Sequence, residues 1–348
     1  MSPLSSVRGT GGSINDTAVK QNQNTLTHPK DHTKGEFTTI TAGTGSWTVP
    51  DGVTKVCIVT VGAGGAGAGV LPYKGCGGGG GGGLSWGNNI TVKPGDSLPY
   101  SVGEGGEGDY SQTGEDGGDT WIKDAEGNYL VLAEGGEGGT SPWRGSGGAG
   151  GYTTGPHGSG VQGGNRGGHG STPHSINWPA YHRSYGGGGG GAGGYEGYGG
   201  NGGYKHTGGP QGDQVDNPED GLGGAGGGGT QGYGGGGVGL YGEGSSGEGG
   251  SSFPAGGKGG SLSSANTESA KNANEPGAGP ELAVEEGGGE QGEYDQGGIC
   301  GGGGAAGGNF FPPDPGAGDD GCDGGLRICW GCGVSFPDNA DGHYPTPA

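Results

Sequence analysis

Unbroken runs of glycine restrict what this chain can fold into more than any other feature of its sequence. Residues 77–83 and 186–191 are continuous glycine, and 107 of the 348 residues are glycine. Hydrophobic residues make up only 26% of the chain, whereas an ordinary globular domain has about 45–50% on a count that includes glycine. The chain therefore either stays largely disordered or is ordered by backbone hydrogen bonds in place of side-chain burial.

An ordered state of this chain needs almost complete backbone pairing. Fixing one backbone costs about 1–2 kcal/mol and glycine lies at the expensive end, so ordering the 107 glycines costs on the order of 100 kcal/mol. Each hydrogen bond returns only about 0.5–1.5 kcal/mol. Extended glycine helices with three residues per turn, packed side by side as in polyglycine II, satisfy this requirement because no Cβ keeps them apart.

Segments with strand character stand on both sides of the glycine runs. Lys55–Val61 is the strongest of them, because β-branched residues occur throughout it. Further strands are expected at 37–42, 45–50, 84–86, 89–92, 98–103 and 326–330, with a hairpin formed by 120–122 and 129–132. We therefore expect a mainly β and irregular fold: a small antiparallel β-sheet closed by N- and C-terminal strands, with a packed bundle of polyglycine II helices and loops.

The same features divide the chain into three parts. Residues 1–35 are polar and are interpreted as an N-terminal arm or linker for attachment. Residues 36–337 form the glycine-rich domain, with β strands in 36–133, a polyglycine region with loop inserts in 134–325 and a closing strand in 326–337. Residues 338–348 are a C-terminal tail.

Charge and hydropathy exclude several classes of partner. The formal net charge is −21, from 36 acidic and 15 basic residues, which argues against nucleic-acid binding and against an anionic membrane surface. No stretch approaches the length of apolar residues that a membrane span or a signal peptide needs. We expect a protein that is made in a cytoplasm, is not exported by the usual route and does not span a membrane.

Because cysteines in a protein that is not exported usually stay reduced, we expect six thiols: Cys57, Cys76, Cys300, Cys322, Cys329 and Cys332. Cys329 and Cys332 have the spacing of a metal or redox pair. A zinc site would need Cys322 and Cys300 as further ligands. Packed thiols are favoured over a disulfide and over zinc.

Three segments carry a family resemblance. Gly45-Ser-Trp-Thr-Val-Pro-Asp-Gly-Val-Thr-Lys-Val-Cys-Ile-Val-Thr-Val-Gly-Ala-Gly-Gly resembles the start of the glycine-rich domain found in many phage tail proteins. Ile90–Asp96 followed by Ser101–Gly106 resembles the next hairpin of that family. Arg327–Pro337 is similar to the closing strand of virion structural proteins, in which Arg-Ile-x-Trp-Gly-x-Gly precedes Phe-Pro.

The resemblance implies a virion protein that is made in the host cytoplasm and carried on the tail or a fibre. Its partners would be other virion proteins, a host surface receptor (a glycan or an outer-membrane protein) and, as a homo-oligomer, further copies of itself. Relatives of this kind include adhesins that present loops on a polyglycine II core. The alternative is a structural fibre, decoration or capsid-associated subunit that self-assembles without binding a receptor. The long polar arm and the large inserts leave the place on the particle open.

Aromatic residues in the glycine region are the best candidates for receptor binding. Their flat faces suit sugar rings or protein surfaces, and the basic residues among them supply hydrogen-bond donors. The candidates are His174, Trp178, Tyr181, His182, Arg183, Tyr185, Tyr195 and Tyr198. Alternatively, these aromatic residues cap the glycine lattice or fill a subunit interface.

Other chemistry is sparse in the sequence. Asp213, Asp216, Glu219 and Asp220 offer oxygen ligands for Ca²⁺, although a solvated acidic turn is the simpler interpretation, and no other cofactor is expected. The sequence has no HExxH motif and no P-loop. We therefore expect that the protein is not an enzyme.

Overall fold

A computed structural model describes the sheets and most of the glycine region. The described residues are 35–69, 76–108, 113–140, 158–171, 174–175, 184–185, 187–206, 214–229, 234–250, 257, 259–261, 301–304, 318–331 and 333–337. For 174–175, 184–185, 204–206 and 214–216, only the backbone is described. The predicted arm, apart from residue 35, and the predicted C-terminal tail lie outside the described residues, so their roles stay predictions.

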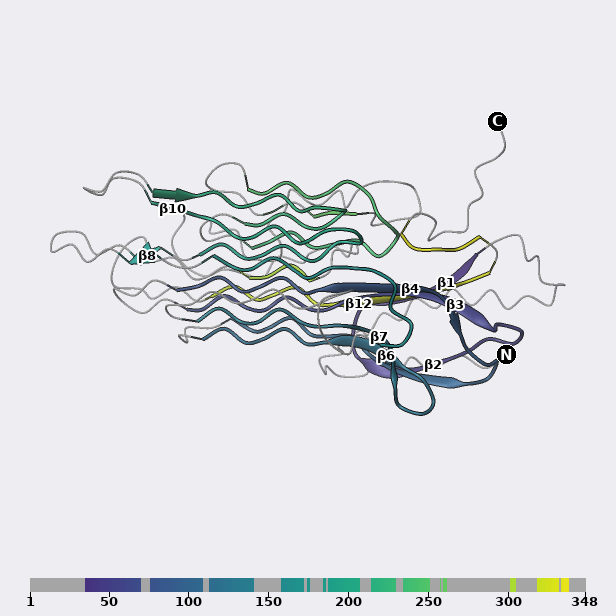
Figure 1. The fold of residues 1–348 in the computed structure, drawn as a ribbon. Helices are drawn as coiled ribbons and strands as arrows, with labels where there is room; N and C mark the ends of the chain where they lie inside the picture. Colours follow the sequence, from purple (N-terminus) through teal and green to yellow (C-terminus); the bar gives the residue numbers. More distant parts are fainter. Residues whose placement is uncertain are drawn as a thin grey trace, which may run out of the picture.

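Two antiparallel sheets of four strands stand at one end of the molecule (Figure 1). Sheet A has the order β1-β12-β3-β4 and sheet B the order β2-β5-β6-β7. The strands are β1 (Glu36–Ile40), β2 (Thr44–Thr48), β3 (Lys55–Val61), β4 (Leu84–Thr91), β5 (Ser97–Ser101), β6 (Thr120–Lys123), β7 (Tyr129–Ala133) and β12 (Gly325–Trp330). Neither sheet closes into a barrel. The β structure is thus divided between two sheets, where the sequence predicted one.

The first and last strands of the domain pair with each other. β1 and β12 lie antiparallel, from the pair Glu36 and Trp330 to the pair Ile40 and Leu326. β12 pairs on its other side with β3, which leads directly into the first glycine segment. The prediction that N- and C-terminal strands close the sheet is therefore confirmed.

Strand β3 is buried on both faces, which explains why its sequence is a continuous apolar run rather than an alternating one. Val56 and Ile58 face the core between the two sheets, together with Ile122 and Val131 of sheet B. The opposite face of β3 carries Cys57, Val59 and Val61. It packs against side chains of the glycine region, among them Ala192, Tyr195, Val238 and Leu240. Sheet A therefore has sheet B on one face and side chains of the glycine region on the other.

The glycine segments run side by side away from the sheets (Figure 1), and their hydrogen bonds repeat every three residues. In segment 62–68, every third N–H donates to the same neighbour: those of Gly62, Gly65 and Ala68 reach segment 77–83. The remaining N–H groups reach segments 113–118 and 318–324, and carbonyls of 62–68 accept from segments 102–108, 134–140 and 301–304. Contact with six neighbours at a period of three is polyglycine II packing, which confirms the predicted fold class.

Close approach of backbones is what makes glycine necessary in this bundle. A Cβ on Gly64 would lie well inside contact distance of the Gly302 carbonyl oxygen, and a Cβ on Gly79 would meet the Gly65 carbonyl in the same way. Rigid backbone stands at both positions, so no side-chain rotation relieves the clash.

Two short hairpins stand at the end of the bundle away from the sheets (Figure 1). β8 (His174–Ser175) pairs with β9 (Ser184–Tyr185), and β10 (Tyr204–His206) pairs with β11 (Gln214–Asp216). In the part of the chain that the structure describes, no helix has the length and apolar character that a membrane crossing requires.

Candidate binding site

Six of the eight candidate residues lie in segment 172–185, here named the aromatic insert, which contains both strands of the β8–β9 hairpin. His174 is paired with Tyr185 at the base of this hairpin, next to the pair formed by Ser175 and Ser184. Because only backbone is described there, the structure places these positions at the far end of the bundle but not their side chains. Trp178, Tyr181, His182 and Arg183 lie outside the described residues, so their predicted role in binding stays a prediction.

Tyr195 is a packing residue. Its side chain is 1% exposed, and its ring stacks on Phe336 with centroids 6.0 Å apart. Its hydroxyl donates to the Gly239 carbonyl oxygen and accepts from the Gly242 N–H, both at 3.2 Å. The prediction that Tyr195 contacts a receptor is therefore corrected, because the ring fills the junction between sheet A and the glycine bundle.

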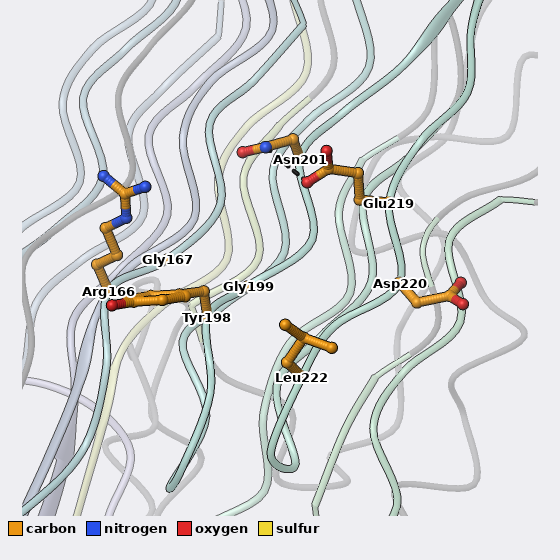
Figure 2. Close-up of a pocket in the computed structure, with 8 residues that line it drawn as sticks. All are labelled: Arg166, Gly167, Tyr198, Gly199, Asn201, Glu219, Asp220 and Leu222. Atoms are coloured by element: carbon orange, nitrogen blue, oxygen red, sulfur yellow. Dashed lines mark hydrogen bonds between the residues drawn. The ribbon is translucent and has the colours of Figure 1, made fainter.

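Tyr198, three residues later, lies at the surface instead. Its side chain is 48% exposed, and the guanidinium carbon of Arg166 is 5.2 Å from the ring centroid. Leu222 is 59% exposed and lies across a shallow hollow of about 140 Å³ from this pair (Figure 2). Tyr198 and Leu222 are the large hydrophobic side chains that the described part of the chain exposes.

Polar groups form the rest of this hollow (Figure 2). Asn201 Nδ2 donates to Glu219 Oε2 at 2.6 Å, and Asn201 Oδ1 accepts the His169 N–H at 2.8 Å. Asp220 Oδ1 accepts the Gly249 N–H at 2.7 Å. The hollow therefore combines an aromatic face, a guanidinium, an amide and two carboxylates, and the bundle's own hydrogen bonds hold the amide and both carboxylates in place.

The predicted calcium ligands divide between described and undescribed positions. Asp213 lies outside the described residues, and Asp216 is described only as backbone of β11. Glu219 and Asp220 accept hydrogen bonds from within the protein. No group of three or more His, Cys, Asp or Glu side chains suited to a metal occurs among the described residues. Because calcium takes six to eight oxygen ligands, Glu219 and Asp220 alone do not make a site.

Arg166, Asn201 and Leu222 were not recognised as candidates from the sequence. A usable signal existed for two of them, because Arg166-Gly-Gly-His169 and Tyr198-Gly-Gly-Asn201 repeat a side chain at every third residue. In a helix with three residues per turn, such positions share one face. Leu222 has no comparable signal, since it lies in a turn between two glycine segments.

The cysteines are separated by the fold. Cys322 precedes β12 and Cys329 is near its end, which places them roughly 20 Å apart at the rise of an extended strand. The zinc set that combined them is therefore wrong; Cys300 and Cys332 lie outside the described residues. Cys329 stands opposite Cys57 in the β3–β12 register, and burial raises the pKa of the Cys57 thiol. Cys57, Cys76 and Cys329 are buried and Cys322 is half-buried, and no disulfide joins any two of these four described cysteines.

Two sheets and a glycine lattice with two short hairpins at its far end define a β protein built on polyglycine II packing. The chain belongs to the glycine-rich domain family, whose profile matches residues 38–261. The match begins in β1 and includes both sheets except β12, together with most of the described glycine segments. A search of curated proteins gives no match to this chain.

Proposed function

We propose that this protein is a component of a phage virion and acts as the distal adhesin of a tail or tail fibre. The observation that carries this proposal is the separation of the two ends of the domain (Figure 1). The first and last strands pair in sheet A at one end, and the β8–β9 and β10–β11 hairpins leave the bundle at the other. One end is therefore suited to attachment through other virion proteins and the opposite end to contact with a host receptor.

The bundle suits such a role because its order does not depend on the loops. Backbone hydrogen bonds between glycine segments hold the scaffold together, and binding residues are commonly carried on loops positioned by a rigid scaffold. A preorganised support also lowers the entropy lost when a loop binds. The loops at the far end can thus differ in sequence while the lattice stays the same.

The aromatic insert, residues 172–185, supplies the chemistry expected of a receptor contact. Trp178, Tyr181 and Tyr185 offer flat aromatic faces, and His182 and Arg183 offer donors. This combination fits a glycan or an outer-membrane protein of the host cell. We assign the protein a binding role and no reaction.

Binding of the labelled protein to candidate host cells tests the proposal. A variant with Trp178→Ala, Tyr181→Ala and Tyr185→Ala should lose saturable binding at least tenfold. The matched control carries Trp121→Ala and Tyr129→Ala, which remove aromatic rings from sheet B at the opposite end. Equal binding by the native chain and the insert variant, or equal loss in both variants, contradicts a receptor site on the insert.

A structural subunit that self-assembles is the second candidate function, and the exposed side chains of Tyr198 and Leu222 on the flank of the bundle favour it. Two exposed apolar side chains beside one hollow are suited to contacts between copies. Light scattering during concentration tests this alternative. Assembly that Tyr198→Ser with Leu222→Ser abolishes, together with no cell binding by the native chain, would make the protein a structural subunit.

A further inference from the structure

Aspartate side chains take the place of backbone carbonyls along one edge of the glycine lattice. The N–H groups of Gly105 and Gly108 in segment 102–108 do not donate to a neighbouring backbone. They donate to Asp323 Oδ1 at 2.8 Å and to Asp320 Oδ1 at 2.6 Å. Both aspartates are exposed, so these hydrogen bonds lie where the lattice meets solvent.

A second edge has the same arrangement. The N–H groups of Gly135 and Gly138 in segment 134–140 donate to Asp119 Oδ1 at 2.9 Å and to Asp116 Oδ1 at 2.7 Å. In each pair the two aspartates are three residues apart and so are the two N–H groups that they accept. Three residues are one turn of the glycine helix, so one carboxylate is provided per turn.

A backbone bond from the next residue accompanies the carboxylate. Asp320 accepts from Gly108, and the N–H of Gly321 donates to the Gly106 carbonyl at 2.9 Å. The same two-point contact, here named the Asp–Gly clamp, recurs where Gly324 reaches Gly103, Gly117 reaches Gly136 and Gly221 reaches Gly247. Each clamp joins an Asp–Gly pair to residues two apart on an antiparallel neighbour. Such recurrence on several segments indicates a rule of this lattice.

The clamp has a consequence for association of the chain with itself. An uncovered row of N–H groups at the edge of a hydrogen-bonded lattice is a template for another chain, as it is at the edge of a β-sheet. A glycine helix of a second copy would supply carbonyl oxygens to this row at the same three-residue period. The carboxylates already occupy the row and place negative charge beside it.

We propose that Asp116, Asp119, Asp320 and Asp323 terminate the glycine lattice and prevent a glycine helix of a second copy from docking on segments 102–108 and 134–140. The surface is thus an interface for a second copy that the carboxylates keep closed. This inference goes beyond the proposed function, because it concerns the flank of the bundle and holds for an adhesin and for a structural subunit alike.

Sedimentation of three double variants, each compared with the native chain at the same concentration, tests the proposal. Asp320→Ala with Asp323→Ala uncovers the N–H row and should raise the mass above that of the native species, with association at least tenfold tighter. Asp320→Asn with Asp323→Asn keeps an acceptor oxygen and should stay at the native mass. Glu104→Ala with Glu107→Ala removes two charges from the same flank without uncovering the row, and should also stay native.

Each other outcome decides against the proposal. If the glutamate control or the asparagine variant associates as strongly as the aspartate-to-alanine variant, charge repulsion and not occupation of the N–H row limits association. Asp116→Ala with Asp119→Ala repeats the test on the second edge. If both aspartate-to-alanine variants keep the native mass while amide exchange at the uncovered glycines accelerates, an uncovered row of N–H groups does not attract a second copy. If both aspartate-to-alanine variants unfold, the aspartates stabilise the fold and do not serve to limit association.

Discussion

The guanidinium carbon of Arg327 lies 3.6 Å from the centroid of the Tyr241 ring, inside the junction between sheet A and the glycine bundle. Arg327 is 0% exposed, and the ring of Phe37 stands 4.0 Å from the same carbon. Arg327 Nη1 also donates to Thr39 Oγ1 at 3.3 Å. The aromatic faces thus take over part of the role of water around a buried cation and connect β1, β12 and the glycine region.

Replacement of Tyr241 by Leu should lower the free energy of unfolding by about 2 kcal/mol, because the Arg327 guanidinium then stays buried but loses its contact with an aromatic ring. Tyr241→Phe keeps the face and should stay within about 0.5 kcal/mol of the native chain. Urea denaturation followed by tryptophan fluorescence measures both. A leucine variant as stable as the phenylalanine variant would show that the ring contributes only packing.

Gly79→Ala should destabilise the protein by about 3 kcal/mol or more, because the new Cβ meets the Gly65 carbonyl and overpacking of rigid structure is costly. Gly118→Ala is the matched control. There the nearest atom, the Gly103 Cα, would be 3.0 Å from the added Cβ, so a small shift relieves the contact. Thermal unfolding of both variants gives the comparison, and equal losses would contradict the idea that interhelix spacing sets the cost.

The strands could be predicted because their residues differ from glycine in a way that the sequence displays. Lys55–Val61 and 326–330 were both predicted and are β3 and β12, since β-branched and apolar residues stand out against the surrounding glycine. Residues 84–86 and 89–92 were expected as two strands and form the single strand β4, although Asn89 adopts a positive φ of 55° within it. The hairpin β10–β11 was not expected.

The surface hollow and the aspartate edges could not be predicted in the same way. The glycine runs are alike in sequence, so the sequence does not indicate which segments become neighbours or which lie at an edge of the lattice. Asp116 and Asp320 look like solvated acidic residues until the neighbouring N–H groups are known. Tyr195 and Tyr198 are three residues apart and both adjoin glycine, yet the Tyr195 ring stacks on Phe336 and the Tyr198 side chain faces solvent.

Cysteine labelling should follow the burial of each thiol. Burial raises the pKa of Cys57, whose Sγ also donates to the Val334 carbonyl at 3.3 Å, so little reactive thiolate exists near neutral pH. Cys329 is fully buried, whereas Cys322 is half-buried. Iodoacetamide at pH 7.5, read by mass spectrometry, should therefore label Cys322 at least tenfold faster than Cys57 or Cys329. Equal rates in urea provide the control, and equal rates in the native protein would contradict the packing of β3 against β12.

Stability should also depend on pH through Asp319. Burial, with a smaller effect of the neighbouring Asp320 charge, raises the pKa of Asp319 from 3.8 to about 8. Between these two values the folded chain keeps a proton that the unfolded chain has lost. Stability rises with pH only where the unfolded state binds more protons, so the contribution of Asp319 to the free energy of unfolding falls as pH increases from about 4 to about 8.

Asp319→Asn removes this dependence because the amide stays neutral. Its stability relative to the native chain should be nearly constant below pH 4 and should then increase, reaching an advantage of about 2 kcal/mol or more above pH 8. Urea denaturation at a series of pH values measures the difference.

Glu104→Gln is the control for this prediction. It removes the same charge from an exposed position on the neighbouring segment 102–108 and should show no such increase. A parallel increase in both variants would assign the effect to net charge, and no increase in either would place the Asp319 carboxyl in water.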